Sequence, residues 1–272
     1  MADGRQSQVV VITGASSGIG LEAAKLFAAR GDRVVLCARR TERLEALRTE
    51  IAKAGGESLI VPLDLADVSA APSLIAEAEK AFGRVDVLVN NAGFGRQCRF
   101  EDMTDADIQR MFAVNLFSPM ALSRAAAKGM RARRSGSIVN VSSVAGVVAS
   151  PLNAVYCSTK HALVGFSRAL RLELKGTGVR VTAVLPGSTA TEFFDVATTD
   201  LPFGKLITAF QAPARKVAKV IVRASRGNRA TICAAFDAWL LWHLDRTFPR
   251  LSGWGNVMYR DSVFRQAKRS RG

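Results

Sequence analysis

Short, almost entirely apolar runs alternate with helix-like segments through the first two thirds of the chain, and this alternation restricts the possible folds most strongly. The intervening segments Glu42 to Ala54 and Ser73 to Phe82 carry apolar residues at helical spacing. Strands that alternate with helices predict βαβ units and a parallel sheet, and apolar runs fit strands covered on both faces. We therefore expect an α/β fold with a doubly wound parallel sheet. The predicted strands are Val9 to Ile12, Val34 to Cys37, Leu59 to Val61, Val85 to Val89, Ile138 to Val141 and Val179 to Val184.

The size and composition of the chain favour one domain followed by an extension. The chain has 272 residues, of which 49% are hydrophobic and 22% charged, which suits one large core. A helix from about Pro213 to Ser225 and a strand near Ala230 to Cys233 are expected to close the sheet. Residues 188–212 read as a long connection of the kind that forms a substrate lid. The predicted domain is 1–233, and 234–272 is a C-terminal helical extension.

Several functional classes are disfavoured by the sequence. The first apolar run begins at Val9, which leaves no room before it for a signal-peptide core, so we expect a cytoplasmic protein. The four cysteines are far apart and lack metal-ligand spacing, so no metal site is expected. We expect free thiols.

The positive charge is concentrated near the C-terminus. The formal net charge is +15, and residues 201–272 contribute 14 Lys and Arg against 3 Asp and Glu. Such a basic region can meet nucleic acid, an anionic membrane or only solvent.

A glycine-rich turn follows the first predicted strand and opens the first predicted helix. Glycines there permit a tight turn and close backbone approach, and the helix N-terminus favours a pyrophosphate. A purely structural turn is the alternative, because the spacing is G-x-x-x-G-x-G rather than G-x-G-x-x-G. The candidate cofactor-binding residues of this turn are Gly14, Ser16, Ser17, Gly18, Ile19 and Gly20.

Two arginines stand where NAD-binding domains usually carry an acid. Arg39 and Arg40 follow the second predicted strand, and a guanidinium is well suited to binding a 2′-phosphate. This pattern favours NADP(H) as the cofactor. A solvated basic pair at a helix start is the alternative.

Tyr156 and Lys160 are four residues apart and share a face if Ala154 to Leu174 is a helix. A neighbouring ammonium favours the ionised phenol, so Tyr156 is a candidate for proton exchange with an alcohol or carbonyl. Ser143, at the end of a predicted strand, is placed to donate a hydrogen bond to the same oxygen.

The order of these motifs resembles the short-chain dehydrogenase/reductase superfamily, whose members have a Rossmann fold. The resemblance covers about residues 8–233 and implies an oxidoreductase that transfers hydride between a nicotinamide and a carbonyl or alcohol. It also implies that Tyr156 is the general acid/base, that Lys160 binds the nicotinamide ribose and lowers the tyrosine pKa, and that Ser143 orients the substrate oxygen. Asn115 matches an asparagine that holds a proton-relay water through a helix irregularity.

The same resemblance assigns further cofactor contacts. Asp64 and Leu65 resemble the pair that contacts the adenine, and Asn91, Ala92 and Gly93 resemble the turn that lines the adenine ribose. Each alone fits ordinary turn chemistry. The segment covering the nicotinamide is matched by Pro186, Gly187, Thr189 and Thr191, with Thr191 on the carboxamide.

The substrate is less defined than the cofactor. Residues expected to shape the pocket are mostly small or apolar, which suggests a lipophilic small-molecule substrate of steroid-, retinoid- or fatty-like character: Phe94, Gly95, Val144, Ala145, Leu152 and Asn153. The competing hypothesis is an NADP(H)-binding redox sensor or interaction protein that uses the basic tail. No recognition-helix signature is present, so no nucleic acid is expected.

The extension departs from many members of the superfamily. An apolar stripe beside arginines suits an interfacial helix on an anionic membrane, and it is too short to span a bilayer. Packing on the lid or on a second subunit of a homodimer or homotetramer is the alternative. The stripe comprises Phe236, Trp239, Leu240, Trp242, Leu244 and Phe248.

Overall fold

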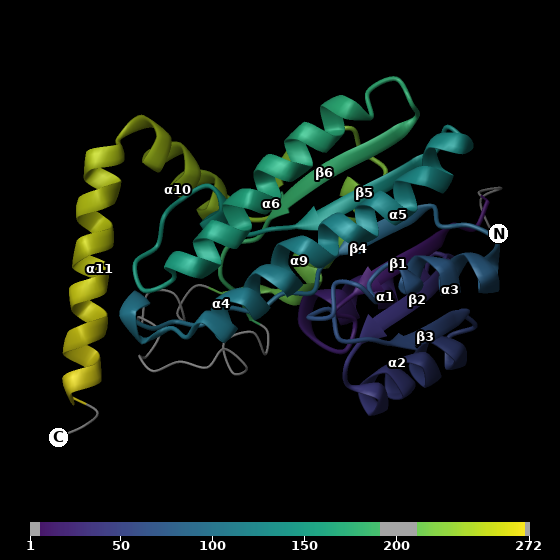
Figure 1. Ribbon diagram of the computed structural model, residues 1–272, viewed down its shortest axis with the longest axis horizontal. Helices are drawn as coiled ribbons and strands as arrows, with labels where there is room; N and C mark the ends of the chain where they lie inside the picture. Colours follow the sequence, from purple (N-terminus) through teal and green to yellow (C-terminus); the bar gives the residue numbers. More distant parts are fainter. Residues whose placement is uncertain (1–5, 191–210, 270–272) are drawn as a thin grey trace.

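The computed structural model describes residues 6–190 and 211–269, and its centre is a sheet of seven parallel strands (Figure 1). The strand order is β3-β2-β1-β4-β5-β6-β9. All the expected strands are present, with ends shifted by one or two residues, and the doubly wound Rossmann fold is confirmed. The strands are β1 (Val9–Thr13), β2 (Arg33–Ala38), β3 (Ser58–Pro62), β4 (Val87–Asn90), β5 (Gly136–Val141), β6 (Val179–Leu185) and β9 (Thr231–Cys233).

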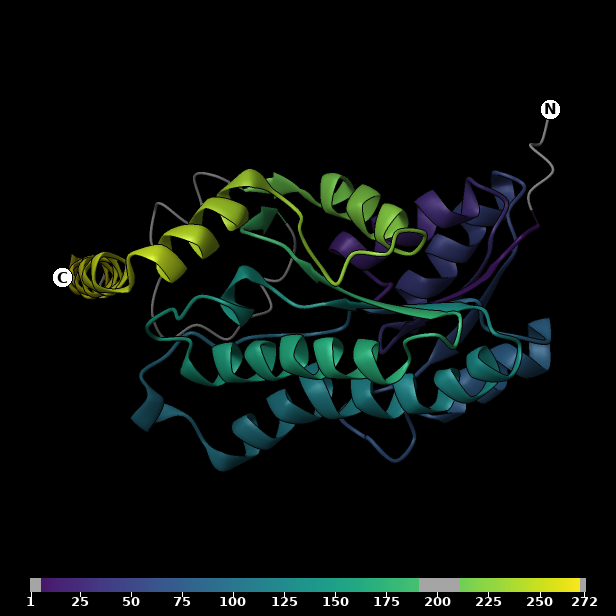
Figure 2. The ribbon, with the colours of Figure 1, turned by 90° about the horizontal axis from the view of Figure 1, so that it is seen from above.

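Helices cover both faces of the sheet, and Figure 2 shows the two layers. Alternate residues of β1 serve separate cores: Val10 and Ile12 face one, Val9 and Val11 the other. This explains why the strand is apolar at every position. One core is completed by α1 (Gly18–Ala28), α2 (Thr41–Lys53) and α9 (Ala214–Ala224), and the other by α3 (Ser73–Phe82), α5 (Ser118–Ala132) and α6 (Ala154–Glu173).

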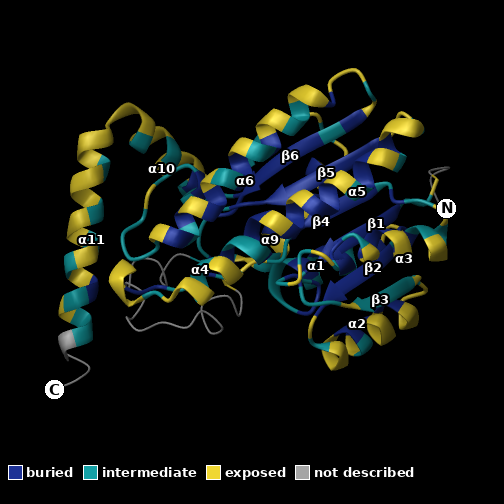
Figure 3. Cartoon of the chain, viewed as in Figure 1, coloured by how far each residue is buried: buried dark blue, intermediate teal, exposed yellow. Residues whose placement is uncertain are grey.

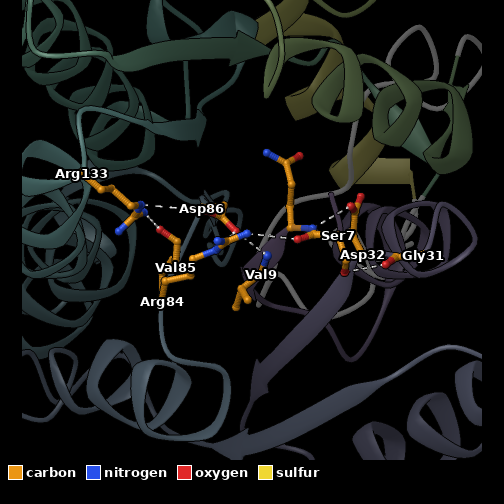
Figure 4. A network of polar contacts seen from close by, with 9 residues as sticks. Ser7, Val9, Gly31, Asp32, Arg84, Val85, Asp86 and Arg133 are labelled. Carbon is orange, nitrogen blue, oxygen red and sulfur yellow. Dashed lines mark hydrogen bonds and ion pairs between the residues drawn. The ribbon is translucent and has the colours of Figure 1, made fainter. Parts of the chain in front are cut away.

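A polar network ties the amino ends of β1 and β4 together (Figure 4). Asp86 Oδ2 accepts hydrogen bonds from Val9 N and from Arg84 Nε, each at 2.9 Å. Arg133 donates to the Val85 carbonyl. β4 begins at Val87 rather than at the expected Val85, and the network holds the edge of the sheet that lies away from the loops described below.

The strand order reverses between β1 and β4, so the loops after these strands diverge at the carboxyl edge of the sheet. In open α/β sheets this reversal forms the crevice in which ligands bind. The glycine-rich turn follows β1 and the Asn91 loop follows β4, so the fold brings both predicted cofactor segments to one edge.

The connection after β6 contains one short parallel pairing, between β7 (Thr189–Ala190) and β8 (Ala212–Pro213). Most of the predicted lid, including Thr191, lies outside the described residues. The proposed assignment of that segment to the nicotinamide therefore stays a prediction.

Two helices follow β9, namely α10 (Phe236–Thr247) and α11 (Pro249–Arg269). Figures 1 and 2 show α11 standing at one end of the molecule, with α10 between it and the sheet. The C-terminal helical extension is thus confirmed, whereas the boundary at residue 233 remains a prediction. Among the described residues, no helix is both long and apolar enough to cross a membrane.

Candidate active site

The glycine-rich turn is folded tightly against the loop after β4. Gly14 has a φ of 67°, a conformation that glycine adopts without strain. A Cβ atom on Gly20 would clash with the Gly14 carbonyl oxygen, so only glycine allows α1 to begin this close to the turn. α1 begins at Gly18, directly after the turn, and its N-terminus suits pyrophosphate binding.

Arg40 is held directly against this turn. Its Nη2 donates to Ser17 Oγ at 2.9 Å and to Ser16 Oγ at 3.0 Å. Arg39 is exposed. A fixed guanidinium beside two hydroxyls and a helix N-terminus suits a phosphate, so the residues present fit the phosphorylated dinucleotide predicted from the sequence.

The loop after β4 is fastened to the end of β1 by one buried hydroxyl. Thr13 Oγ1 accepts hydrogen bonds from Asn91 N at 2.9 Å and Ala92 N at 3.0 Å. Asn91 Nδ2 donates back to the Thr13 carbonyl at 2.9 Å. The Asn91 turn is therefore held directly against the end of β1.

Asp64 and Leu65 occupy the loop after β3. Burial raises the pKa of the Asp64 carboxyl, but hydrogen bonds from the Ala66 N–H and Arg110 outweigh it and hold the pKa below its usual range. The Arg110 Nη2 to Asp64 Oδ2 distance is 2.9 Å. Leu65 is buried, and its carbonyl accepts a 2.7 Å hydrogen bond from Ser118. Asp64 therefore remains a carboxylate near the predicted adenine end.

Tyr156 and Lys160 both lie on α6, as the four-residue spacing predicts, and Ser143 follows β5. The Ser143 hydroxyl is hydrogen-bonded to the Tyr156 hydroxyl. Lys160 is only 4% exposed, and its Nζ lies 5.7 Å from the Tyr156 ring centroid. Lys160 Nζ also donates to the Val141 carbonyl at 3.2 Å. The three predicted groups therefore form one cluster.

The protonation of this cluster is governed by burial. Burial raises the pKa of Tyr156 to about 12, against an opposing hydrogen bond from Ser143. Burial also lowers the pKa of Lys160 to about 8. The sequence-based expectation of a lowered tyrosine pKa is not met in this structure, because removal from water outweighs the hydrogen bond from Ser143.

Asn115 lies in the π-helical turn η2 (Ala113–Phe117), which joins α4 (Asp105–Phe112) to α5. Its Nδ2 donates to the Phe94 carbonyl at 2.9 Å and to Thr159 Oγ1 at 3.1 Å. A Cβ atom added to Gly93 would stand 3.1 Å from Asn115 Oδ1 and 3.2 Å from Lys160 Nζ. Gly93, Asn115 and Lys160 thus converge, and the helix irregularity that the sequence resemblance implies is present.

The loop after β6 closes the cluster from the other side. Val144 N donates to the Pro186 carbonyl at 2.8 Å, and Thr189 Oγ1 donates to the Gly187 carbonyl at 3.1 Å. Asp237, in the first turn of α10, lies close to this loop: its Oδ2 is 2.5 Å from the position that a Gly187 Cβ would occupy. The extension therefore reaches the candidate active site.

Sequence reasoning missed three hydroxyl groups that support the site. Thr13 holds the Asn91 loop, Thr159 accepts from Asn115, and Ser142 Oγ donates to the Lys160 carbonyl at 3.0 Å. Each neighbours a predicted residue in sequence. Their chemistry gives no signal until the tertiary contacts are known, because a buried Ser or Thr is commonly satisfied by local backbone groups.

The sequence profile described as short chain dehydrogenase matches residues 8–201, which is most of the chain. The chain belongs to the short-chain dehydrogenase/reductase family. A similar curated protein is the dehydrogenase/reductase SDR family member 7B of Mus musculus, 38% identical over 187 residues. That alignment covers 67% of this chain but only 58% of the mouse protein.

Solved structures of the family resemble the chain over more of its length. A short-chain dehydrogenase/reductase from Burkholderia phymatum, in complex with NAD, has a TM-score of 0.81 at 26% identity, covering 90% of this chain and 95% of that one. A metagenomic short-chain oxidoreductase in complex with NADP has a TM-score of 0.70 at 36% identity, covering 83% of this chain and 94% of that chain. These neighbours support a nicotinamide cofactor for the fold without deciding between NAD and NADP.

Proposed function

We propose that this chain is an NADP(H)-dependent oxidoreductase that transfers hydride between the nicotinamide and a carbonyl or secondary alcohol of a lipophilic substrate. The observation that carries the proposal is the hydrogen-bonded pair of Ser143 and Tyr156 hydroxyls beside the buried Lys160 amine. This cluster stands at the same sheet edge as the glycine-rich turn.

The cluster is arranged for proton transfer. The bound nicotinamide would supply or accept the hydride. Because the pKa of Tyr156 is raised to about 12, its hydroxyl is protonated at neutral pH and serves as the acid that protonates a developing alkoxide. Ser143 donates a hydrogen bond to the same oxygen and stabilises its charge. Lys160, with a pKa near 8, supplies positive charge next to the tyrosine at neutral pH.

The preference for NADP(H) is supported by the arginines rather than by the relatives. The two similar structures hold NAD and NADP respectively, so the fold accommodates either. In this chain Arg40 is fixed on Ser16 and Ser17, and no acid stands at the end of β2 to repel a 2′-phosphate.

The lipophilic substrate is supported by uncharged residues after β4 and between Ser143 and Tyr156. Val144 and Ala145 lie in the short helix η3 (Val144–Gly146), Leu152 is partly buried, and Phe94 is partly buried in the loop after β4. None of these four side chains carries a charge, which favours an apolar substrate group beside them.

The test is turnover of NADPH with a panel of steroid, retinoid, fatty and small ketones, using Tyr156→Phe. We expect Tyr156→Phe to lose nearly all turnover while NADPH binding is retained, since only the transferable proton is removed. Tyr259→Phe, which alters the only other tyrosine of the chain, is the matched control and should keep the parental rate. Tyr156→Phe with a rate within a few-fold of the parent would refute the assignment, and NADPH binding without any oxidation would favour a redox sensor.

A further inference from the structure

Large apolar side chains are unusually exposed on the two C-terminal helices. Among the described residues, 14 large hydrophobic side chains are exposed, and 10 of them lie on α10, on α11 or at the junction between these helices. Figure 3 shows that α11 is exposed along most of its length, in contrast to the buried sheet. The ten residues, here called the tail face, are Phe236, Trp239, Leu240, Leu241, Leu244, Phe248, Leu251, Trp254, Val257 and Met258.

The described part of the fold covers only part of these helices. Ala238 is buried, and Trp242 stacks under the guanidinium of Arg168 at 5.9 Å from its ring centroid, so one side of α10 packs on the body. On α11, Val263 is buried and Phe264 lies beneath Arg99 at 5.0 Å. Trp254, by contrast, is 64% exposed. Monomeric proteins rarely expose so many large apolar side chains on two neighbouring helices without a partner.

The charges next to the tail face indicate the kind of partner. Arg246, Arg250 and Arg265 are exposed on the same two helices, and Arg260, also exposed, forms an ion pair with the adjacent Asp261. Residues 201–272 carry a net charge of +11. A second copy of the chain would bring these like charges together in a symmetric contact, whereas anionic lipid headgroups would neutralise them.

We propose that α10 and α11 form a docking surface for anionic lipid membranes, with the tail face in the headgroup boundary and the arginines among the headgroups. Tryptophan and leucine beside arginine are the residues that favour this interface. Neither helix crosses the bilayer, so the contact is peripheral and reversible.

Docking in this way would bring the candidate active site close to the lipid. α10 packs against η3, which follows Ser143, and Asp237 lies against Gly187. A lipophilic substrate could then reach the site from the bilayer. Only this last step rests on the proposed function; the docking itself does not.

The chain supplies its own probe for the test. All three tryptophans, Trp239, Trp242 and Trp254, lie in the tail, so intrinsic fluorescence reports on this region alone. The full-length protein is titrated with vesicles of phosphatidylcholine alone and with vesicles containing phosphatidylglycerol. We expect a blue shift with the anionic vesicles, weakened by high salt, and little change with phosphatidylcholine.

Two pairs of variants separate the apolar and charged contributions. Leu251→Ala keeps every tryptophan and should weaken vesicle binding several-fold. Leu172→Ala removes another exposed leucine, on α6 and outside the tail, and should not weaken binding. Arg250→Glu with Arg265→Glu should weaken it by about tenfold or more. Lys219→Glu with Arg223→Glu changes the net charge equally on the exposed face of α9 and should bind like the parent.

Three outcomes would overturn the proposal. These are the absence of any spectral shift with anionic vesicles, equal binding to neutral vesicles, and a concentration-dependent dimer that buries the tryptophans without lipid. The last outcome would assign the tail face to a second copy of the chain. None of these readouts uses turnover, so failure here is distinguishable from failure of the proposed activity.

Discussion

Lys160 illustrates how a functional requirement acts against stability at the scale of one residue. Its pKa is lowered to about 8 by burial, so the folded protein disfavours the charged form that the unfolded chain carries up to about pH 10.5. A lowered folded-state pKa in a base means that stability is reduced below pH 8 and recovers as the pH rises from 8 to 10.5. The amine is retained in spite of this cost, which fits a role in the chemistry of Tyr156.

This argument makes a prediction for Lys160→Met. The variant lacks the buried charge, so we expect its free energy of unfolding at pH 7 to exceed that of the parent by on the order of 1–3 kcal/mol. The difference should shrink as the pH approaches 10, while turnover is lost. Urea unfolding at pH 7, 8.5 and 10 measures it, with the exposed Lys219→Met as control. A pH-independent difference would contradict burial as the cause.

Arg40 carries the second prediction at this scale. Arg40→Ala should weaken NADP(H) binding by about one to two decades, because a charge-assisted phosphate contact is worth roughly 1.5–3 kcal/mol, and should leave NAD(H) binding nearly unchanged. Arg39→Ala is the matched comparison, since Arg39 is exposed and its charge acts on Asp64. Titration of both cofactors by fluorescence gives the ratio. Equal affinity of the parent for NADP(H) and NAD(H) would refute the preference.

The positions of individual site residues were predictable where a sequence motif marks them. Ser143 follows a strand, Tyr156 and Lys160 share one helix, Asn115 lies in η2, and the structure brings these four residues together. The direction of the Tyr156 pKa was not predictable, because it depends on the depth of burial. Thr13 and Thr159 were missed for a different reason: their hydrogen-bond partners lie far away in the sequence.

At the scale of elements, α10 is the least expected contributor to the site. Sequence patterns predicted the strands and the helix over Ala154 to Leu174 because periodicity reports which faces are buried. The same patterns identify an apolar stripe from Phe236 onward but not its neighbour in space. The contact of Asp237 with Gly187 arises only because β9 ends beside β6 and directs the chain back across the carboxyl edge.

The contact between α10 and the site loop is testable by a double-mutant cycle. Gly187→Ala would place a Cβ 2.5 Å from Asp237 Oδ2, so the carboxylate or α10 must shift. We expect a loss of stability on the order of 1 kcal/mol and a raised KM, both largely reversed by adding Asp237→Ala. Gly165→Ala, in α6 with open space around it, should be neutral or stabilising. Additive effects of the two site mutations would show that α10 does not contact the loop.

At the scale of the whole molecule, only four of the exposed large apolar side chains among the described residues lie outside the tail face. Phe117, Met120 and Leu172 are exposed in or beside α5 and α6. An interface between subunits over these side chains is compatible with the predicted homodimer or homotetramer. Light scattering would measure the oligomeric state. The sequence could not assign partners to either surface, because periodicity reveals an amphipathic helix but not what covers it.

Membrane docking and catalysis combine in a prediction about where the substrate is presented. If the tail face docks on anionic lipid and α10 borders the site, a lipophilic ketone dissolved in phosphatidylglycerol-containing vesicles should be reduced several-fold faster than in phosphatidylcholine vesicles. Leu251→Ala should remove this advantage. A water-soluble ketone should be reduced at the same rate with either vesicle and by either protein, since the substitution lies outside the candidate site. Equal rates from both kinds of vesicle, with a soluble ketone still turned over, would separate the tail from substrate delivery while leaving the active-site assignment intact.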